Sequence, residues 1–271
     1  MTEQEFHMYA DYVGQHFGIQ LPHEKKALLE TRLYKLFNSG QIPGHADPRS
    51  FYQYLQQDRT GRARQLMADA ITTNHTYFMR EPDHFEYFSQ AVLPYWAQHI
   101  RDGDVRTWCA ACSSGEEAYT LAMLLQDFFQ MRGGRWEYSL LATDLSPEIL
   151  AAARKGIYLT ESVRQMPVHF QTAYFHRVDD AHMQVVDFIR RQVIYRQFNL
   201  MCTAFPFKRP FHTIFCRNVM IYFDVQTRQA IARRFYDFLE PGGFLFVGHS
   251  EVIDRQSVPF DYVMPSVYRR M

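Results

Sequence analysis

The sequence lacks the features that mark membrane-inserted, secreted or nucleic-acid-coating proteins. No stretch approaches the ~18 consecutive apolar residues of a membrane span, and the first residues, MTEQEFHMYADYVGQHF, contain no basic segment followed by an apolar one. Neither sign of charge is in excess, because Lys+Arg and Asp+Glu both total 29. A neutral chain argues against wholesale binding to nucleic acid, although it does not exclude a local basic patch. We therefore expect a cytoplasmic protein without membrane insertion and without a nucleic-acid partner.

Cysteine is also scarce, with four residues at positions 109, 112, 202 and 216. Cys109 and Cys112 form a C-x-x-C pair, a spacing that also occurs in zinc and redox sites. A zinc site needs a second ligand pair at similar spacing, and Cys202 and Cys216 lie too far apart to supply it. We interpret the pair as small buried residues at a strand end and predict no metal site.

The pattern of apolar residues divides the chain into two parts. Residues 1–75 predict helices, because apolar side chains recur every three to four positions over Gln4–Phe17 and Pro22–Phe37. A loop rich in Gly and Pro follows, and then two further helices, one capped by Ser50 and running through Leu55 and one over Gly61–Thr72. We expect an all-helical N-terminal domain.

From about residue 104, in contrast, strands and helices alternate. We predict a second domain over residues 76–271. Apolar strands are expected at 105–111, 138–143, 212–216 and 244–248, with helices over Glu116–Phe129, from Ser146, and from Asp224 to Leu239. This alternation predicts an α/β fold with a parallel sheet covered on both faces. Residues 175–198 alternate polar and apolar side chains, and we predict a small antiparallel β insertion that ends in a strand at VIYRQF.

Polar residues replace hydrophobic ones at four strand ends, where ligands bind in a doubly wound sheet. The first strand is followed by C-S-S-G-E-E, residues 112–117. Small residues ending in Gly115 allow close approach of a ligand, whereas two glutamates repel a pyrophosphate and favour a cation with hydroxyl groups, such as S-adenosylmethionine (SAM). Glutamate near a helix N-terminus is also favourable without any ligand. The loop alone therefore does not decide whether a ligand binds at this strand end.

The other three strand ends strengthen this interpretation. Asp144 follows the second strand and is well placed for ribose hydroxyls, because Ser146 already serves as the helix cap. Asn199 and Leu200 offer an amide and an apolar side chain suited to the edge and face of an adenine. Arg217 and Asn218 follow a buried strand and need partners if they are buried as well.

At this point the chain resembles a known family, the chemotaxis receptor methyltransferases (CheR). The resemblance covers essentially the whole chain, in family order, through TTNHTYFMR (72–80), WCAACSSGEEAY (108–119), ATDLS (142–146), ARKGIY (153–158), IFCRNVMIYF (214–223) and GGFLFVGHSE (242–251). It implies a class I SAM-dependent methyltransferase fold: a Rossmann-like, mostly parallel seven-stranded sheet, an N-terminal all-helical domain and a small β insertion. Met79 and Ala118 depart from the family pattern, which commonly has a second aromatic residue and a proline there.

The resemblance also implies roles for individual residues. It places Arg80 and Tyr222 nearest the transferred methyl group, as the catalytic residues. It sets a basic helix bearing Lys25, Arg32 and Lys35 against the acidic methylation helices of the receptor. Matching positions imply cofactor contacts from Asn74, Thr76, Arg80, Glu117, Asp144, Asn199, Leu200, Arg217 and Asn218.

The implied activity is methyl transfer from SAM to glutamate carboxylates of methyl-accepting chemotaxis receptors, giving glutamyl methyl esters and S-adenosylhomocysteine. The implied partner is the cytoplasmic domain of such a receptor, and we expect a monomeric enzyme. Some relatives bind a pentapeptide at the receptor C-terminus through a glycine-containing loop in the β insertion. The corresponding turn here, VDDAHM, has no glycine, so we predict that no such tether is used.

Two other functions remain open on the residues alone. One is a methyltransferase of this fold acting on a different acidic protein or a small molecule, which would need another surface in place of the receptor-facing one. The other is a SAM-binding regulator without catalysis, which would keep Asp144 and Glu117 without needing Tyr222. The presence of all three residues favours an enzyme.

Overall fold

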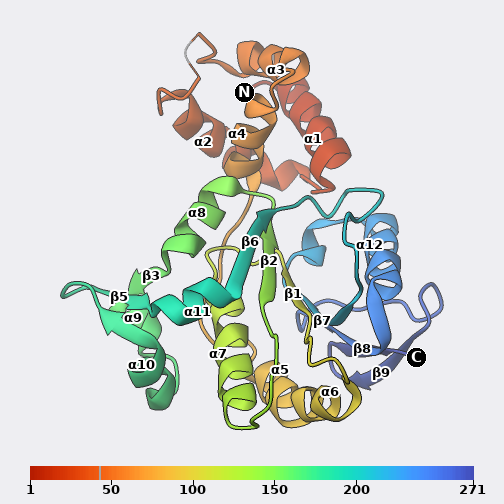
Figure 1. Ribbon diagram of the computed structural model, residues 1–271. Helices are drawn as coiled ribbons and strands as arrows, with labels where there is room; N and C mark the ends of the chain where they lie inside the picture. The colour runs from red at the N-terminus through yellow and green to blue at the C-terminus, as the bar shows by residue number, and fades with distance from the viewer. Residues whose placement is uncertain (43) are drawn as a thin grey trace.

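The N-terminal part of the chain is a separate bundle of helices that stands on one end of an α/β domain (Figure 1). The computed structural model describes residues 1–42 and 44–271. Among these residues, no helix is both long enough and apolar enough to cross a bilayer. The predicted all-helical N-terminal domain is confirmed, with α1 Glu3–Phe17, the short 3-10 helix η1 His23–Lys25, α2 Lys26–Phe37, α3 Pro48–Gln57 and α4 Arg62–Ile71.

Local sequence signals fix the ends of these helices. Thr2 and Glu5 form a capping box at α1, in which each side chain accepts a hydrogen bond from the other residue's backbone N–H. The prediction that Ser50 caps the third helix was wrong. Asp47 is the cap, because its carboxylate accepts hydrogen bonds from the backbone N–H groups of Arg49 and Ser50, at 3.0 and 3.1 Å. Pro48 then occupies the first helical position, which places Ser50 inside the first turn.

The α/β domain is built on a seven-stranded, mostly parallel sheet in the order β6-β2-β1-β7-β8-β10-β9, as the resemblance implies. The first five strands in this order run parallel, whereas β10 pairs antiparallel with both β8 and β9. The carboxyl ends of the parallel strands therefore meet at one edge, where a ligand is expected. The strands are β1 Thr107–Ala110, β2 Leu140–Asp144, β6 Val193–Gln197, β7 Phe211–Cys216, β8 Leu239–Val247, β9 Phe260–Met264 and β10 Val267–Arg270.

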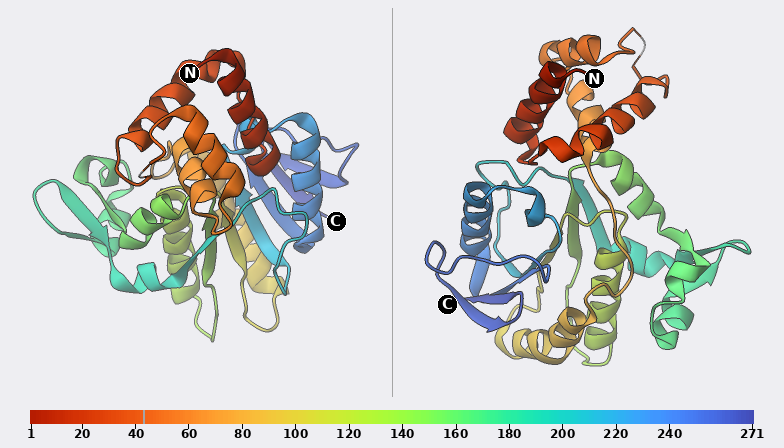
Figure 2. Two further views of the ribbon diagram at one scale, coloured as in Figure 1. Left: turned by 90° about the horizontal axis from the view of Figure 1, so that it is seen from above. Right: turned by 180° about the vertical axis from the view of Figure 1, so that it is seen from behind.

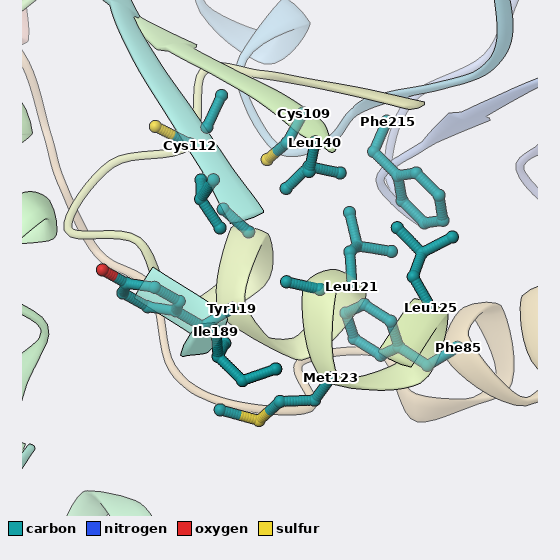
Figure 3. Packing of buried hydrophobic residues seen from close by; sticks show 14 of the residues in the cluster. Phe85, Cys109, Cys112, Tyr119, Leu121, Met123, Leu125, Leu140, Ile189 and Phe215 are labelled. Carbon is teal, nitrogen blue, oxygen red and sulfur yellow. The ribbon is translucent and has the colours of Figure 1, made fainter. Parts of the chain in front are cut away.

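Each face of this sheet packs against its own hydrophobic core, as expected for a buried parallel sheet. Strand β1 shows the alternation, because Cys109 belongs to one core and Trp108 to the other. The first core contains α7, whose Leu121 and Leu125 lie near Phe215 (Figure 3). The second core contains α12. The helices of this domain are α5 Pro82–Tyr87, the π-helical turn η2 Phe88–Val92, α6 Leu93–His99, α7 Glu116–Gln130, α8 Pro147–Lys155 and α12 Val225–Asp237.

The small antiparallel sheet is present, but its position differs from the prediction of residues 175–198. Its strands are β3 Ile157–Leu159, β4 Phe175–Arg177 and β5 His182–Val185, in the order β3-β5-β4. The VIYRQF strand does not belong to it, because β6 pairs parallel with β2 at the edge of the large sheet. Alternating burial is common to an edge strand and to an exposed hairpin, so the pattern could not separate the two. Short helices complete the region: α9 Thr160–Val163, α10 Val168–Tyr174 and α11 Asp187–Gln192.

An extended segment, residues 72–81, joins the two domains. It runs from the end of α4 along the α/β domain to α5, as Figure 2 shows from behind. Ser113, in the loop after β1, donates a hydrogen bond from its hydroxyl to the backbone oxygen of Asn74, at 3.1 Å. We call residues 72–81 the strap. It carries three of the residues for which the resemblance implies cofactor contacts.

Candidate active site

A pocket lies at the carboxyl ends of the parallel strands, with the strap along one wall. Its empty space, counted together with the open solvent at its mouth, is about 980 Å³. Its walls come from the loops after β1, β2, β6 and β7, from the strap, and from the end of α1. Every residue implied to touch the cofactor or the methyl group lines it: Asn74, Thr76, Arg80, Glu117, Asp144, Asn199, Leu200, Arg217, Asn218 and Tyr222.

The loop after β1 approaches the pocket with an unusual backbone. Ala111 and Ser113 both have positive φ, at 67° and 51°. Gly115 follows with φ 99°, and a Cβ there would lie 2.8 Å from the Tyr195 hydroxyl oxygen, so the position requires glycine. Of the six non-glycine residues with positive φ in the described chain, five lie in or beside pocket segments: Met79, Glu81, Ala111, Ser113 and Asn218. Such strain is characteristic of functional sites.

Asp144 joins the loops after β1 and β2. Its Oδ2 accepts a hydrogen bond from the Ser113 backbone N–H at 2.8 Å, and its Oδ1 accepts one from the Ser146 N–H at 3.1 Å. Burial raises the pKa of Asp144, and these backbone hydrogen bonds partly offset that rise. A carboxylate has about four acceptor positions. Asp144, which lines the pocket, therefore keeps acceptor capacity for a ligand.

A buried cluster of charges crosses the floor of the site. The Arg217 guanidinium, fully buried, lies 3.0 Å from Glu81 Oε2 and 3.1 Å from Glu117 Oε2. The contact with Glu81 is a hydrogen bond, whereas the Glu117 contact is an ion pair without hydrogen-bond alignment. Burial raises the pKa of Glu117, and the neighbouring Arg217 counteracts this. Arg217 therefore pairs with one acid of the pocket lining, Glu117, and with one acid outside it, Glu81.

Arg80 and Tyr222 reach the pocket from different segments of the chain: Arg80 from the strap and Tyr222 from the turn after β7. The Arg80 guanidinium donates a hydrogen bond to the His75 carbonyl at 2.9 Å and lies 5.8 Å from the centre of the Tyr77 ring. Tyr222 ends the 3-10 helix η3 Met220–Tyr222, and its carbonyl accepts a hydrogen bond from the Gln20 N–H at 2.8 Å. Both side chains are half-buried, so each retains a surface that a ligand can contact.

The N-terminal domain contributes pocket residues that the sequence did not predict. Phe17 and Ile19, at the end of α1, line the pocket. Next to them, the Asn199 side-chain amide donates a hydrogen bond to the His16 carbonyl at 2.9 Å. Nothing in the spacing of an amphipathic helix distinguishes a residue that closes a neighbouring domain's pocket from one that fills its own core. Glu81 and Glu251 were also missed, although both lie within or next to motifs of the resemblance.

The three basic residues predicted to face the receptor do not share one exposed surface. Lys35 is exposed and Lys25 is half-buried. The Arg32 guanidinium points inward, where it donates hydrogen bonds to the carbonyls of Ile71 and Thr72, at 2.6 and 3.2 Å. It also donates to the Thr73 hydroxyl at 3.0 Å. Arg32 therefore caps the C-terminus of α4 and holds the start of the strap.

One group of side chains among the described residues has the spacing of metal ligands, but its charges oppose a metal. Ligand atoms of Glu81, His84 and His249 lie within 4.8 Å of one another. The Glu81 carboxylate, however, already accepts hydrogen bonds from Arg217 and Asn218, both at 3.0 Å. A guanidinium beside the site repels a second cation. His84 is fully buried and its ring packs edge-on against that of Phe246, where burial lowers the pKa of the imidazole to about 4.

Comparison with known proteins agrees with this geometry. A family model described as "CheR methyltransferase, SAM binding domain" matches residues 74–268, and one described as "CheR methyltransferase, all-alpha domain" matches residues 4–72. The chain is 36% identical to a chemotaxis protein methyltransferase of Borreliella burgdorferi, over 100% of this chain and 95% of the relative. It is 35% identical to the chemotaxis protein methyltransferase of Escherichia coli, over 93% of this chain and 85% of the relative.

The residues of the pocket fit SAM, the cofactor of this family. SAM carries ribose hydroxyls, an adenine and a sulfonium cation, and the pocket offers a buried carboxylate with free acceptor capacity, an amide and a second carboxylate. Asp144, Asn199 and Glu117 are the residues concerned. The positive φ of Ser113 and the absence of a side chain at Gly115 let the backbone approach closely.

Proposed function

Since this chain belongs to the CheR methyltransferase family, we propose that it transfers a methyl group from SAM to glutamate side chains of methyl-accepting chemotaxis receptors. The products are glutamyl methyl esters and S-adenosylhomocysteine. The observation that carries the proposal is convergence: residues from the strap and from four strand ends, far apart in the sequence, line one pocket that contains both Arg80 and Tyr222.

Acidic groups on this chain are not needed to activate the acceptor. A glutamate with a pKa of ~4.3 is already ionised at neutral pH, so the reaction requires no general base. When bound, SAM supplies an electrophilic methyl group on a positively charged sulfur. Charge is lost as the anion approaches the cation, and exclusion of water by the pocket walls favours that change. Orientation of the carboxylate supplies much of the remaining acceleration.

Arg80 orients the acceptor carboxylate in this proposal. An arginine paired with a carboxylate stabilises the ionised reactant more than the transition state, where the negative charge is declining, so its useful effect is positioning. Its hydrogen bond to the His75 carbonyl, at 2.9 Å, limits the movement of the guanidinium. Tyr222 orients the sulfonium and methyl group through its ring face or its hydroxyl.

The remaining pocket residues hold the cofactor. Asp144 accepts the ribose hydroxyls with the acceptor positions that Ser113 and Ser146 leave free. Asn199 and Leu200 contact the adenine, Glu117 adds negative charge near the cation, and Arg217 and Asn218 complete the wall.

The test is incubation of the protein with methyl-labelled SAM and receptor cytoplasmic fragments. We expect label in the receptor that mild alkali releases as methanol, because carboxyl methyl esters hydrolyse under these conditions. Asp144→Ala, which removes a cofactor contact, serves as the control and should transfer much less label. Label that resists alkali, or no label in any receptor fragment, would contradict the proposal.

A further inference from the structure

The segment between β7 and α12 is held by two acids that do not line the pocket. Residues 217–222 begin with Arg217 and Asn218 and end with Tyr222, all of which line the pocket. Asn218 has φ 57°, a left-handed conformation that asparagine adopts more readily than most non-glycine residues. The carboxylate that accepts hydrogen bonds from the backbone of this segment comes from outside the pocket.

Glu251 fixes its backbone. This residue is 2% exposed and follows β8. Its Oε2 accepts hydrogen bonds from the N–H groups of Asn218 and Gly248, at 2.9 and 2.6 Å. Its Oε1 accepts one from the Ile221 N–H at 3.2 Å. A single carboxylate thus joins both ends of the segment to the loop after β8, through bonds that are stronger than those between neutral groups.

Glu81 holds the same segment through its side chains, whereas Glu251 holds its backbone. Its Oε1 accepts a hydrogen bond from the Asn218 side-chain amide at 3.0 Å, and its Oε2 accepts one from Arg217, also at 3.0 Å. Glu81 is the neighbour of Arg80 in the strap. The Arg80 carbonyl itself accepts a hydrogen bond from Arg217. Movement of this segment would therefore change the position of Arg80 relative to Tyr222.

Gly248 packs tightly against Asn218, the residue that both acids hold. A Cβ at Gly248 would lie 2.4 Å from the Asn218 side-chain nitrogen and 2.9 Å from its backbone nitrogen. Even one methyl group would displace Asn218. The position requires glycine for space, although its φ is not in the left-handed region.

We propose that Glu81 and Glu251 are positioning residues for methyl transfer, forming a carboxylate clamp that sets the placement of Tyr222 relative to Arg80. The inference rests on the proposed function for its reaction. The clamp itself follows from the hydrogen bonds above. A purely structural pair of acids would affect stability alone, whereas a clamp affects the turnover number more than cofactor affinity.

The test compares Glu251→Gln with Glu240→Gln. Glutamine keeps the size of the side chain but directs an NH₂ group at backbone N–H donors, so at least one clamp bond is lost. Glu240, at the opposite end of β8, accepts a hydrogen bond from Arg106 at 2.6 Å and is the matched control. Turnover with receptor fragments, SAM affinity by calorimetry, and amide hydrogen exchange of residues 217–222 are measured for each variant.

For Glu251→Gln we expect faster exchange at Asn218 and Ile221, and a turnover number lowered roughly 10- to 100-fold, with a much smaller loss of SAM affinity. Glu240→Gln should change none of these. Equal losses of turnover and SAM affinity, or a turnover number matching that of Glu240→Gln, would overturn the inference. If Glu251→Gln does not fold, Glu81→Gln provides the same comparison. If neither glutamine variant folds, the two acids serve stability, and this outcome also overturns the inference.

The exchange measurement separates this inference from the proposed function. If the wild-type protein methylates no receptor fragment, the proposed function fails. The clamp is then decided by exchange alone: faster exchange at Asn218 and Ile221 in Glu251→Gln supports it, and unchanged exchange contradicts it.

Discussion

Individual residues at this site serve a ligand-facing and a structural role at the same time. Asp144 lines the pocket while its two oxygens accept backbone hydrogen bonds from Ser113 and Ser146. Arg217 lines it while it pairs with Glu81 and Glu117. Removal of such a side chain leaves buried groups without partners, at a cost of about 1–3 kcal/mol each. Variants of similar shape therefore have to be measured beside alanine variants at this site.

Tyr222 permits such a comparison. If its hydroxyl acts in the transition state, Tyr222→Phe should lower the turnover number while SAM affinity stays near that of the wild type. If the ring alone orients the sulfonium, Phe preserves activity and Tyr222→Ala lowers the turnover number by about 2- to 30-fold, which corresponds to a cation–π energy of ~0.5–2 kcal/mol. Tyr262→Phe, at an exposed position on β9, is the control. Normal turnover in both Tyr222 variants, with intact folding, would exclude this residue from the chemistry.

At the level of secondary structure, elements with strong local signals could be predicted from the sequence. Ser146 caps α8 and Asp224 caps α12, as expected, because each combines a capping side chain with a following helical pattern. Contacts between elements could not be predicted in this way. The edge strand β6 shares its alternating pattern with a hairpin, and only pairing with β2 distinguishes them. Arg32 likewise lies on a helix whose periodicity gives no sign that α4 ends beside it.

The contacts of Arg32 lead to different expectations for two residues of α2. Arg32→Ala removes hydrogen bonds to the end of α4 and to the strap, so it should lower the free energy of unfolding by about 1–2 kcal/mol, allowing for partial exposure. It should also weaken SAM binding. Lys35→Glu, at an exposed site, should leave the free energy of unfolding and the SAM affinity unchanged. It should raise KM for an acidic receptor at low salt. Calorimetry, thermal unfolding and receptor kinetics check these outcomes. Unchanged SAM affinity in Arg32→Ala would show that the strap does not depend on this residue.

In the molecule as a whole, the cofactor pocket belongs to both domains. The α/β domain supplies the strand ends, and the helical domain supplies Phe17, Ile19 and the start of the strap. The backbone hydrogen bond from Gln20 to the Tyr222 carbonyl, 2.8 Å long, connects the helical domain directly to the segment held by the carboxylate clamp. The α/β domain alone would therefore lack part of the pocket wall and one support of Tyr222.

The central claim is that this pocket directs a methyl group to glutamate carboxylates of a receptor. Peptide mapping after incubation with methyl-labelled SAM tests it most directly, with a receptor fragment in which the labelled glutamates are then replaced by glutamine. We expect that label is confined to glutamates and that each glutamine replacement removes the corresponding label. Label that persists after these replacements, or that lies on lysine or cysteine, would contradict it.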